Sequence, residues 1–187
     1  MDRDLVERAM AGDREAFTEL TRISIGLLHA IARLILRDRE RAEDATQEAL
    51  VAAWRQLSAL RDPDRFEPWL RRLLVRACYR EASKHRRQWT IASRIGLTAP
   101  IAAHVGADPG IVISDQDELE RAFSRLAPDR RALIVLHYYL GLPLQETSAI
   151  LGIPVGTVKS RLTRTTTQMR ANLEADARLP LRGKTTA

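Results

Sequence analysis

LPLQETSAILGIPVGTVKSRL, residues 142–162, predicts two helices joined by a tight turn. The pattern indicates a short helix over 144–151 that ends at Gly152, because glycine is common where a helix stops. A second helix is expected from about Pro154, since proline is tolerated in a first turn. A brief helix, a glycine turn and a second helix form the helix–turn–helix arrangement.

The second of these helices has one apolar edge and an outer face of hydroxyls and cations. We expect Val155, Val158 and Leu162 to pack on the first helix, and no acidic residue occurs from 155 to 173. A helix that enters a DNA groove needs such donors on its outer face. An ordinary helix pair with a solvated cationic face is the alternative, and the glycine turn and the missing acids favour DNA binding. The candidate DNA-binding residues are Thr157, Lys159, Ser160, Arg161, Thr163 and Arg164.

Helical spacing predicts three helices in the first half of the chain. Asp13 is a good N-cap for the first, Asp38 starts the second, and the third begins near Pro68. On the second helix, small apolar residues form one stripe, and residues 38–48 hold five acidic and two basic side chains. This acidic face is either a solvated helix surface or a binding surface for a partner. The stripe expected to be buried is Ala42, Ala45, Ala49, Leu50, Ala53, Trp54 and Leu57.

The third helix is basic and begins with a large aromatic residue. Helical spacing predicts that its core side is formed by Leu70, Leu73, Leu74, Ala77 and Cys78. Residues 70–90 hold seven Lys/Arg and one acidic side chain. A basic run is often only solvated, but aromatic rings stack on unpaired bases while cations hold phosphates. The pattern therefore favours nucleic acid as the partner. The candidate residues are Trp69, Arg72, Arg76, Tyr79, Arg80, Lys84, Arg86 and Arg87.

Composition limits the class of protein. The chain has 187 residues, a net charge of +6, 45% hydrophobic and 5% aromatic residues, which favours packed helices and a polyanionic partner. A single cysteine, Cys78, excludes an internal disulfide framework and suits a cytoplasmic location. No signal peptide or membrane span is expected. The sequence indicates no metal site, no cofactor and no catalytic motif, so an enzyme is the least favoured class.

A change in composition divides the chain. Residues 95–107 contain no Asp, Glu, Lys or Arg and are rich in Gly and Pro, which predicts a linker. We therefore expect an all-α protein of two small helical domains joined by a flexible linker, the C-terminal one with the helix–turn–helix. The expected bounds are 1–88 and 115–175 for the domains, 89–114 for the linker and 176–187 for a tail.

Three segments in this order resemble the bacterial extracytoplasmic-function (group IV) sigma factors of the sigma-70 family. RAEDATQEALVAAW at 41–54 is similar to the family's core-binding helix. FEPWLRRLLVRACYREASKHRR at 66–87 resembles its segment for promoter melting and −10 recognition. The stretch 119–164, LERAFSRLAPDRRALIVLHYYLGLPLQETSAILGIPVGTVKSRLTR, is similar to the domain that reads the −35 element.

The resemblance implies a sigma factor that binds core RNA polymerase, through its beta and beta-prime subunits, and directs promoter recognition, DNA opening and transcription initiation. It places the core polymerase contact at Asp44, Gln47, Glu48 and Val51. The basic third helix would hold the opened −10 strand, and the helix–turn–helix would read the −35 element. Promoter DNA is thus the second partner, and an anti-sigma factor is a further candidate. No membrane insertion is implied.

Five positions depart from the pattern of the family. Arg76 and Arg80 stand where relatives commonly have Asn and Asp, and Thr147 and Ser148 replace apolar residues of the first helix of the helix–turn–helix. Pro154 replaces a frequent serine cap of the second helix. The rival interpretation is a stand-alone helix–turn–helix regulator that binds an operator. The acidic face and the basic helix that begins with Trp69 favour the sigma factor, because an operator-binding protein needs neither.

Overall fold

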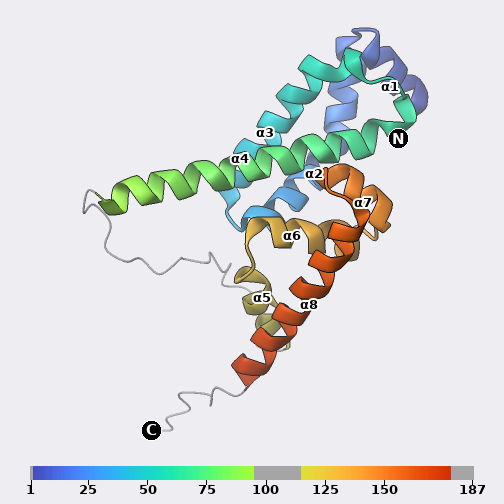
Figure 1. Cartoon of the computed structure of the whole chain (residues 1–187). Coiled ribbons are helices and arrows are strands. Elements are labelled where there is room, and N and C mark those ends of the chain that lie inside the picture. The colour runs from blue at the N-terminus through green and yellow to red at the C-terminus, as the bar shows by residue number, and fades with distance from the viewer. Residues whose placement is uncertain (1, 95–114, 178–187) are drawn as a thin grey trace, which may run out of the picture.

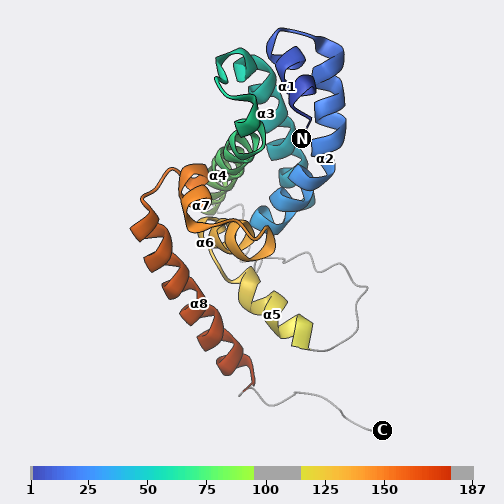
Figure 2. The same cartoon turned by 90° about the vertical axis from the view of Figure 1, so that its right-hand side faces the viewer.

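The computed structural model describes residues 2–94 and 115–177, and all regular structure in these two ranges is helical (Figures 1 and 2). The all-α prediction is confirmed. Leu57–Ala59 and Pro63–Arg65 form 3₁₀ turns before α4, and Val135–Tyr139 form a π-helical turn after α6. The α-helices are α1 (Arg3–Met10), α2 (Arg14–Leu36), α3 (Arg39–Gln56), α4 (Phe66–Arg94), α5 (Asp115–Ser124), α6 (Pro128–Ile134), α7 (Leu144–Leu151) and α8 (Val155–Ala177).

Local capping interactions fix the helix ends that the sequence predicts. The Asp13 carboxylate accepts hydrogen bonds from the backbone N–H groups of Glu15 (2.9 Å) and Ala16 (3.0 Å) and starts α2. Asp38 starts α3 in the same way. Gly152 ends α7 with a φ of 68°, a left-handed conformation that glycine adopts without steric cost.

Two helices differ from the sequence expectation. α1 was not expected, and it forms because Asp2 caps its first turn and Val6 and Ala9 are buried. α4 begins at Phe66 rather than near Pro68 and continues to Arg94, six residues into the predicted linker. No Gly or Pro interrupts the chain between Pro68 and Gly96, so nothing local stops the helix at residue 88. The rest of that linker, 95–114, and most of the predicted tail, 178–187, lie outside the described residues.

The core of the first half lies where α2, α3 and α4 meet. Ala42, Ala45, Ala49 and Ala53 are fully buried, and their small side chains let α4 approach α3 closely. The expectation for Trp54 is wrong, because its side chain is 41% exposed and packs against the ring of Phe17 at a centroid distance of 4.9 Å. On α4, the expected core side is buried throughout: Leu70, Leu73, Leu74, Ala77 and Cys78.

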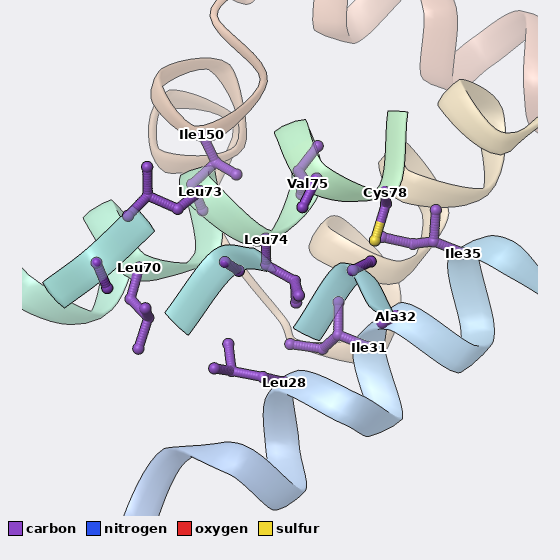
Figure 3. Close-up of a cluster of buried hydrophobic side chains, with 14 of the residues drawn as sticks. Leu28, Ile31, Ala32, Ile35, Leu70, Leu73, Leu74, Val75, Cys78 and Ile150 are labelled. Carbon is purple, nitrogen blue, oxygen red and sulfur yellow. The ribbon is translucent and has the colours of Figure 1, made fainter. Parts of the chain in front are cut away.

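The two halves of the chain share one hydrophobic core. α7 packs on α4 and α6 packs on α2, as Figures 1 and 2 show. Figure 3 shows Ile150 of α7 beside Leu73 and Val75 of α4, and all three side chains belong to one cluster of buried residues. Ion pairs of Arg37 with Glu120, and of Arg71 with Glu146, also join the halves.

Candidate functional site

The helix–turn–helix is formed by α7 and the first turns of α8. Val158 and Leu162 pack with Leu133 in a small second core. The expectation for Val155 is wrong, because its side chain is 38% exposed and does not belong to this second core. Val158 and Leu162 therefore hold the recognition helix in place without it.

The outer face of α8 is largely as the sequence predicts. Lys159 and Arg164 are exposed and form no ion pair in residues 2–94 and 115–177. Ser160 donates its hydroxyl to the carbonyl of Thr157, and Thr163 donates to that of Lys159, both at 3.1 Å. These hydroxyls keep acceptor capacity toward an incoming donor. The face thus offers free cations at its two ends and adaptable hydroxyls between them.

The two unusual residues of α7 have opposite environments. Thr147 is fully buried, and its Oγ1 has no hydrogen-bond partner among the described residues. Ser148 donates from Oγ to the backbone carbonyl of Ile153 at 2.5 Å, across the turn. The unpaired hydroxyl of Thr147 therefore destabilises the helix–turn–helix, whereas the hydrogen bond of Ser148 stabilises its turn.

The acidic face of α3 forms one wall of a cleft, and α4 forms the other. The cleft has a volume of about 660 Å³ and is lined by the four predicted polymerase-binding residues, among others. Val51 is 43% exposed, so an apolar spot lies beside the acids. The side chains that line the cleft are Asp38, Glu40, Arg41, Asp44, Gln47, Glu48, Val51, Glu81, Lys84 and His85.

The structure adds a member to this cleft that sequence reasoning missed. Glu81 of α4 is buried, with only 7% of its surface exposed, and it forms an ion pair with Lys84. Its place beside the α3 acids depends on how α4 packs on α3, which the local sequence does not show. The one available signal was that Glu81 is the single acid in a run of seven cations.

The basic stripe of α4 is divided into free and paired cations. Arg72, Arg76 and Arg87 are exposed, whereas Arg80 Nε lies 2.8 Å from Glu48 Oε1. Lys84 is paired with Glu81, as described above. Trp69 is partly buried, with its ring 5.9 Å from that of Phe66. The side chain of Arg86 is not described.

Tyr79 faces the second half of the chain. Burial raises the pKa of its phenol well above the usual range, the charge of Asp129 raises it further, and the charge of Arg161 lowers it. Asp129 lies on α6 and Arg161 on α8, so a predicted −10 residue and a predicted −35 residue lie near each other. In this arrangement Tyr79 is partly buried rather than fully open to a DNA strand.

The described residues offer no further chemical site. Burial raises the pKa of the Cys78 thiol to about 12, so it stays protonated and unreactive at neutral pH. No group of three or more metal-ligating side chains occurs in the two described ranges. Within those ranges, no helix combines the length and the apolar character that crossing a membrane requires.

Comparisons with known proteins match both halves. The model for Sigma-70 region 2 matches residues 22–88, and that for Sigma-70, region 4 matches residues 116–169. The chain is 34% identical over 167 residues to the ECF RNA polymerase sigma factor SigM of Mycobacterium tuberculosis, covering 87% of this chain and 80% of that relative. It is 30% identical over 173 residues to the ECF RNA polymerase sigma-E factor of Escherichia coli K12, covering 87% and 89%.

Solved structures show the same architecture. CnrH, in complex with the cytosolic domain of CnrY, matches with a TM-score of 0.63 and 29% identity, covering 94% of this chain and 98% of that one. The sigma factor RpoE of Bartonella quintana, in complex with the anti-sigma factor NepR, matches with a TM-score of 0.64 at 24% identity, which supports the fold. It covers 86% of this chain and 98% of that one. This chain therefore belongs to the extracytoplasmic-function sigma factors of the sigma-70 family.

Proposed function

We propose that this sigma factor uses three separate surfaces: the acidic face of α3 for core RNA polymerase, α4 for the opened −10 strand, and α8 for the −35 element. The observation that carries the proposal is the presence of two distinct cationic helices and one acidic cleft in a single chain. The two matched regions support a division into an N-terminal and a C-terminal domain. We place the action of the protein in the cytoplasm, where RNA polymerase is.

The polymerase contact is proposed at Asp44, Gln47, Glu48 and Val51. An exposed apolar residue among acids suits a partner with basic side chains, and charge complementarity of this kind speeds association and makes it sensitive to salt. We expect that reversing Asp44 and Glu48 to Lys abolishes co-purification with core polymerase while the helical circular dichroism is kept. Undiminished binding by the folded double variant would contradict this assignment.

The −35 contact is proposed for α8, and two of its cations have different expected roles. If Arg164 reads a base, Arg164→Ala costs about 1–3 kcal/mol and relaxes preference at one position. If Lys159 contacts only phosphate, Lys159→Ala weakens binding to all sequences alike and lowers the salt slope by about one. Binding of holoenzyme to a randomised −35 library at several salt concentrations separates these outcomes. No change with either variant would show that this face does not enter the groove.

Promoter binding requires the two halves to separate. Elements at −10 and −35 are about 25 base pairs apart, which is on the order of 80 Å along B-DNA at 3.4 Å per base pair. Here Tyr79 of α4 lies near Arg161 of α8, and α7 packs directly on α4. We infer that binding to core polymerase breaks this interface and exposes Tyr79.

The central experiment is run-off transcription with purified core polymerase on a library of promoters. A sigma factor gives initiation from a defined subset of promoters that core polymerase alone does not use. A stand-alone regulator, the alternative function, binds DNA without polymerase and gives no initiation when added to core. The full chain with both Lys159→Ala and Arg164→Ala serves as the control, because it should keep core binding and lose −35 dependence.

A further inference from the structure

One ion pair joins two surfaces that the sequence assigns to different partners. Arg80 Nε of α4 lies 2.8 Å from Glu48 Oε1 of α3. Glu48 is a proposed polymerase contact, whereas Arg80 is a proposed −10 DNA contact. The side chains are 47% and 37% exposed for Arg80 and Glu48, respectively. Both side chains are therefore accessible to a partner, and in the free chain they pair with each other.

The pair leaves Glu48 incompletely satisfied. Its second oxygen, Oε2, is buried and accepts no hydrogen bond from any residue that the structure describes. A carboxylate can accept several hydrogen bonds, so Arg80 uses only part of this capacity. Glu48 also lines the acidic cleft beside Asp44 and Glu81. A cationic side chain from a partner would therefore meet a favourable field at Glu48, and a turn of the carboxylate away from Arg80 would bring the unused oxygen within its reach.

Arg80 differs in this respect from the two arginines that precede it on the basic stripe of α4. Arg72 and Arg76 are exposed and form no ion pair in the part of the chain that the structure describes. Arg80 lies on the side of α4 that faces α3, and these two helices pack tightly against each other. Because both partners belong to the first half, the pair does not depend on where the second half sits.

We propose that Arg80 couples polymerase binding to −10 DNA binding. In the free chain, Arg80 pairs with the carboxylate of Glu48, and this pairing largely neutralises the charge of Arg80. A basic side chain of core polymerase that pairs with Glu48 releases Arg80 toward the phosphates of the −10 strand. This inference rests on the proposed function of the α3 face. Coupling of this kind is reciprocal, so DNA that engages Arg80 also frees Glu48 for the polymerase.

The first test measures the affinity of the fluorescently labelled full chain for core polymerase from its own organism, at fixed ionic strength. Arg80→Gln should bind core polymerase about two- to five-fold more tightly, because Glu48 no longer has to be released from an exposed ion pair. This gain should vanish in the Glu48→Gln background. Arg76→Gln, which removes an equal charge one turn away, is the control and should give no gain.

The second test measures binding of the free chain to a fluorescent single-stranded oligonucleotide. Glu48→Gln should bind it about two- to five-fold more tightly, because Arg80 is no longer neutralised. Asp44→Asn removes a charge from the same cleft without touching Arg80, and should give a smaller gain. The gain from Glu48→Gln should be absent when Arg80 is also replaced by Gln.

Two outcomes have different meanings. The coupling is refuted if Arg80→Gln leaves the affinity for core polymerase unchanged. It is also refuted if Arg80→Gln changes that affinity equally in the parent chain and in the Glu48→Gln variant. In both cases the proposed polymerase contact stands. If the parent chain does not bind core polymerase at all, the proposed function itself is refuted, and the inference fails with it. A loss of folding cannot imitate the expected result, because the prediction is a gain of affinity.

Discussion

Replacing Thr147 by valine removes a buried hydroxyl while keeping a β-branched side chain of similar shape, and we expect the chain to become more stable. Thr147 has no exposed surface, and its Oγ1 has no hydrogen-bond partner in the described residues. Burying an unsatisfied hydroxyl costs about 1–3 kcal/mol. Because α7 packs on α4, we expect the halves to unfold together. For a chain of this size, each kcal/mol raises the melting temperature by about 2–4 °C.

The neighbouring residue gives a matched control of opposite sign. Ser148→Ala removes the hydrogen bond to the carbonyl of Ile153, which costs about 0.5–1.5 kcal/mol, partly offset by the better helix propensity of alanine. Urea and thermal denaturation, followed by far-UV circular dichroism, measure both variants. A Thr147→Val variant no more stable than the parent would refute the reasoning, because the hydroxyl would then have a partner in solution.

Four further predictions concern single residues. Val158→Asp should unfold the helix–turn–helix, because it buries a charge without a partner; a variant that keeps native circular dichroism and −35 binding would contradict this. Trp69→Ala should reduce permanganate reactivity of promoter thymines more than closed-complex formation, since base stacking is worth about 1–3 kcal/mol; equal opening would assign Trp69 to the core with Phe66. Cys78 should react with a thiol reagent at pH 8 only after unfolding, because burial raises its pKa to about 12; fast reaction of the native chain would show that α4 opens locally. Arg131→Met should raise the midpoint of urea unfolding at neutral pH, since Arg131 Nε is buried without a partner.

The prediction for Arg131 also has a pH dependence with a definite sign. Burial, and then the charges of Arg37 and Arg41, lower the pKa of this guanidinium from 12.5 to about 10. The folded state therefore disfavours the charged form of Arg131, and the full free-energy cost of burying this charge is present below about pH 10. It is relieved only as the pH rises above that value. The stability gain of Arg131→Met should thus be constant from pH 6 to 9, and a gain that falls across this range would contradict the assignment.

The sequence by itself determined the helices, because the signals for them are local. Asp13 and Asp38 cap α2 and α3 through N–H groups two or three residues away, and Gly152 ends α7 through its own φ. Periodicity also identified the buried side of α4. It was wrong for Trp54 and Val155, which satisfy the helical spacing but remain 41% and 38% exposed, because spacing does not show how fully a neighbouring helix covers a side chain. α1 was missed because eight residues carry too short a pattern.

Only the tertiary structure decided which candidate residues meet. Arg80 and Glu48 are 32 positions apart, and their pairing follows from how α4 packs on the alanine stripe of α3. Tyr79 lies near Arg161 because α6 and α7, which carry α8, pack on the first half. Local sequence encodes the residue types and the helix faces, but contacts between distant segments depend on shape complementarity over the whole core. For this reason the sequence could name the three binding surfaces, and only the fold could show that an ion pair joins two of them and that Tyr79, on one of these two, is partly buried.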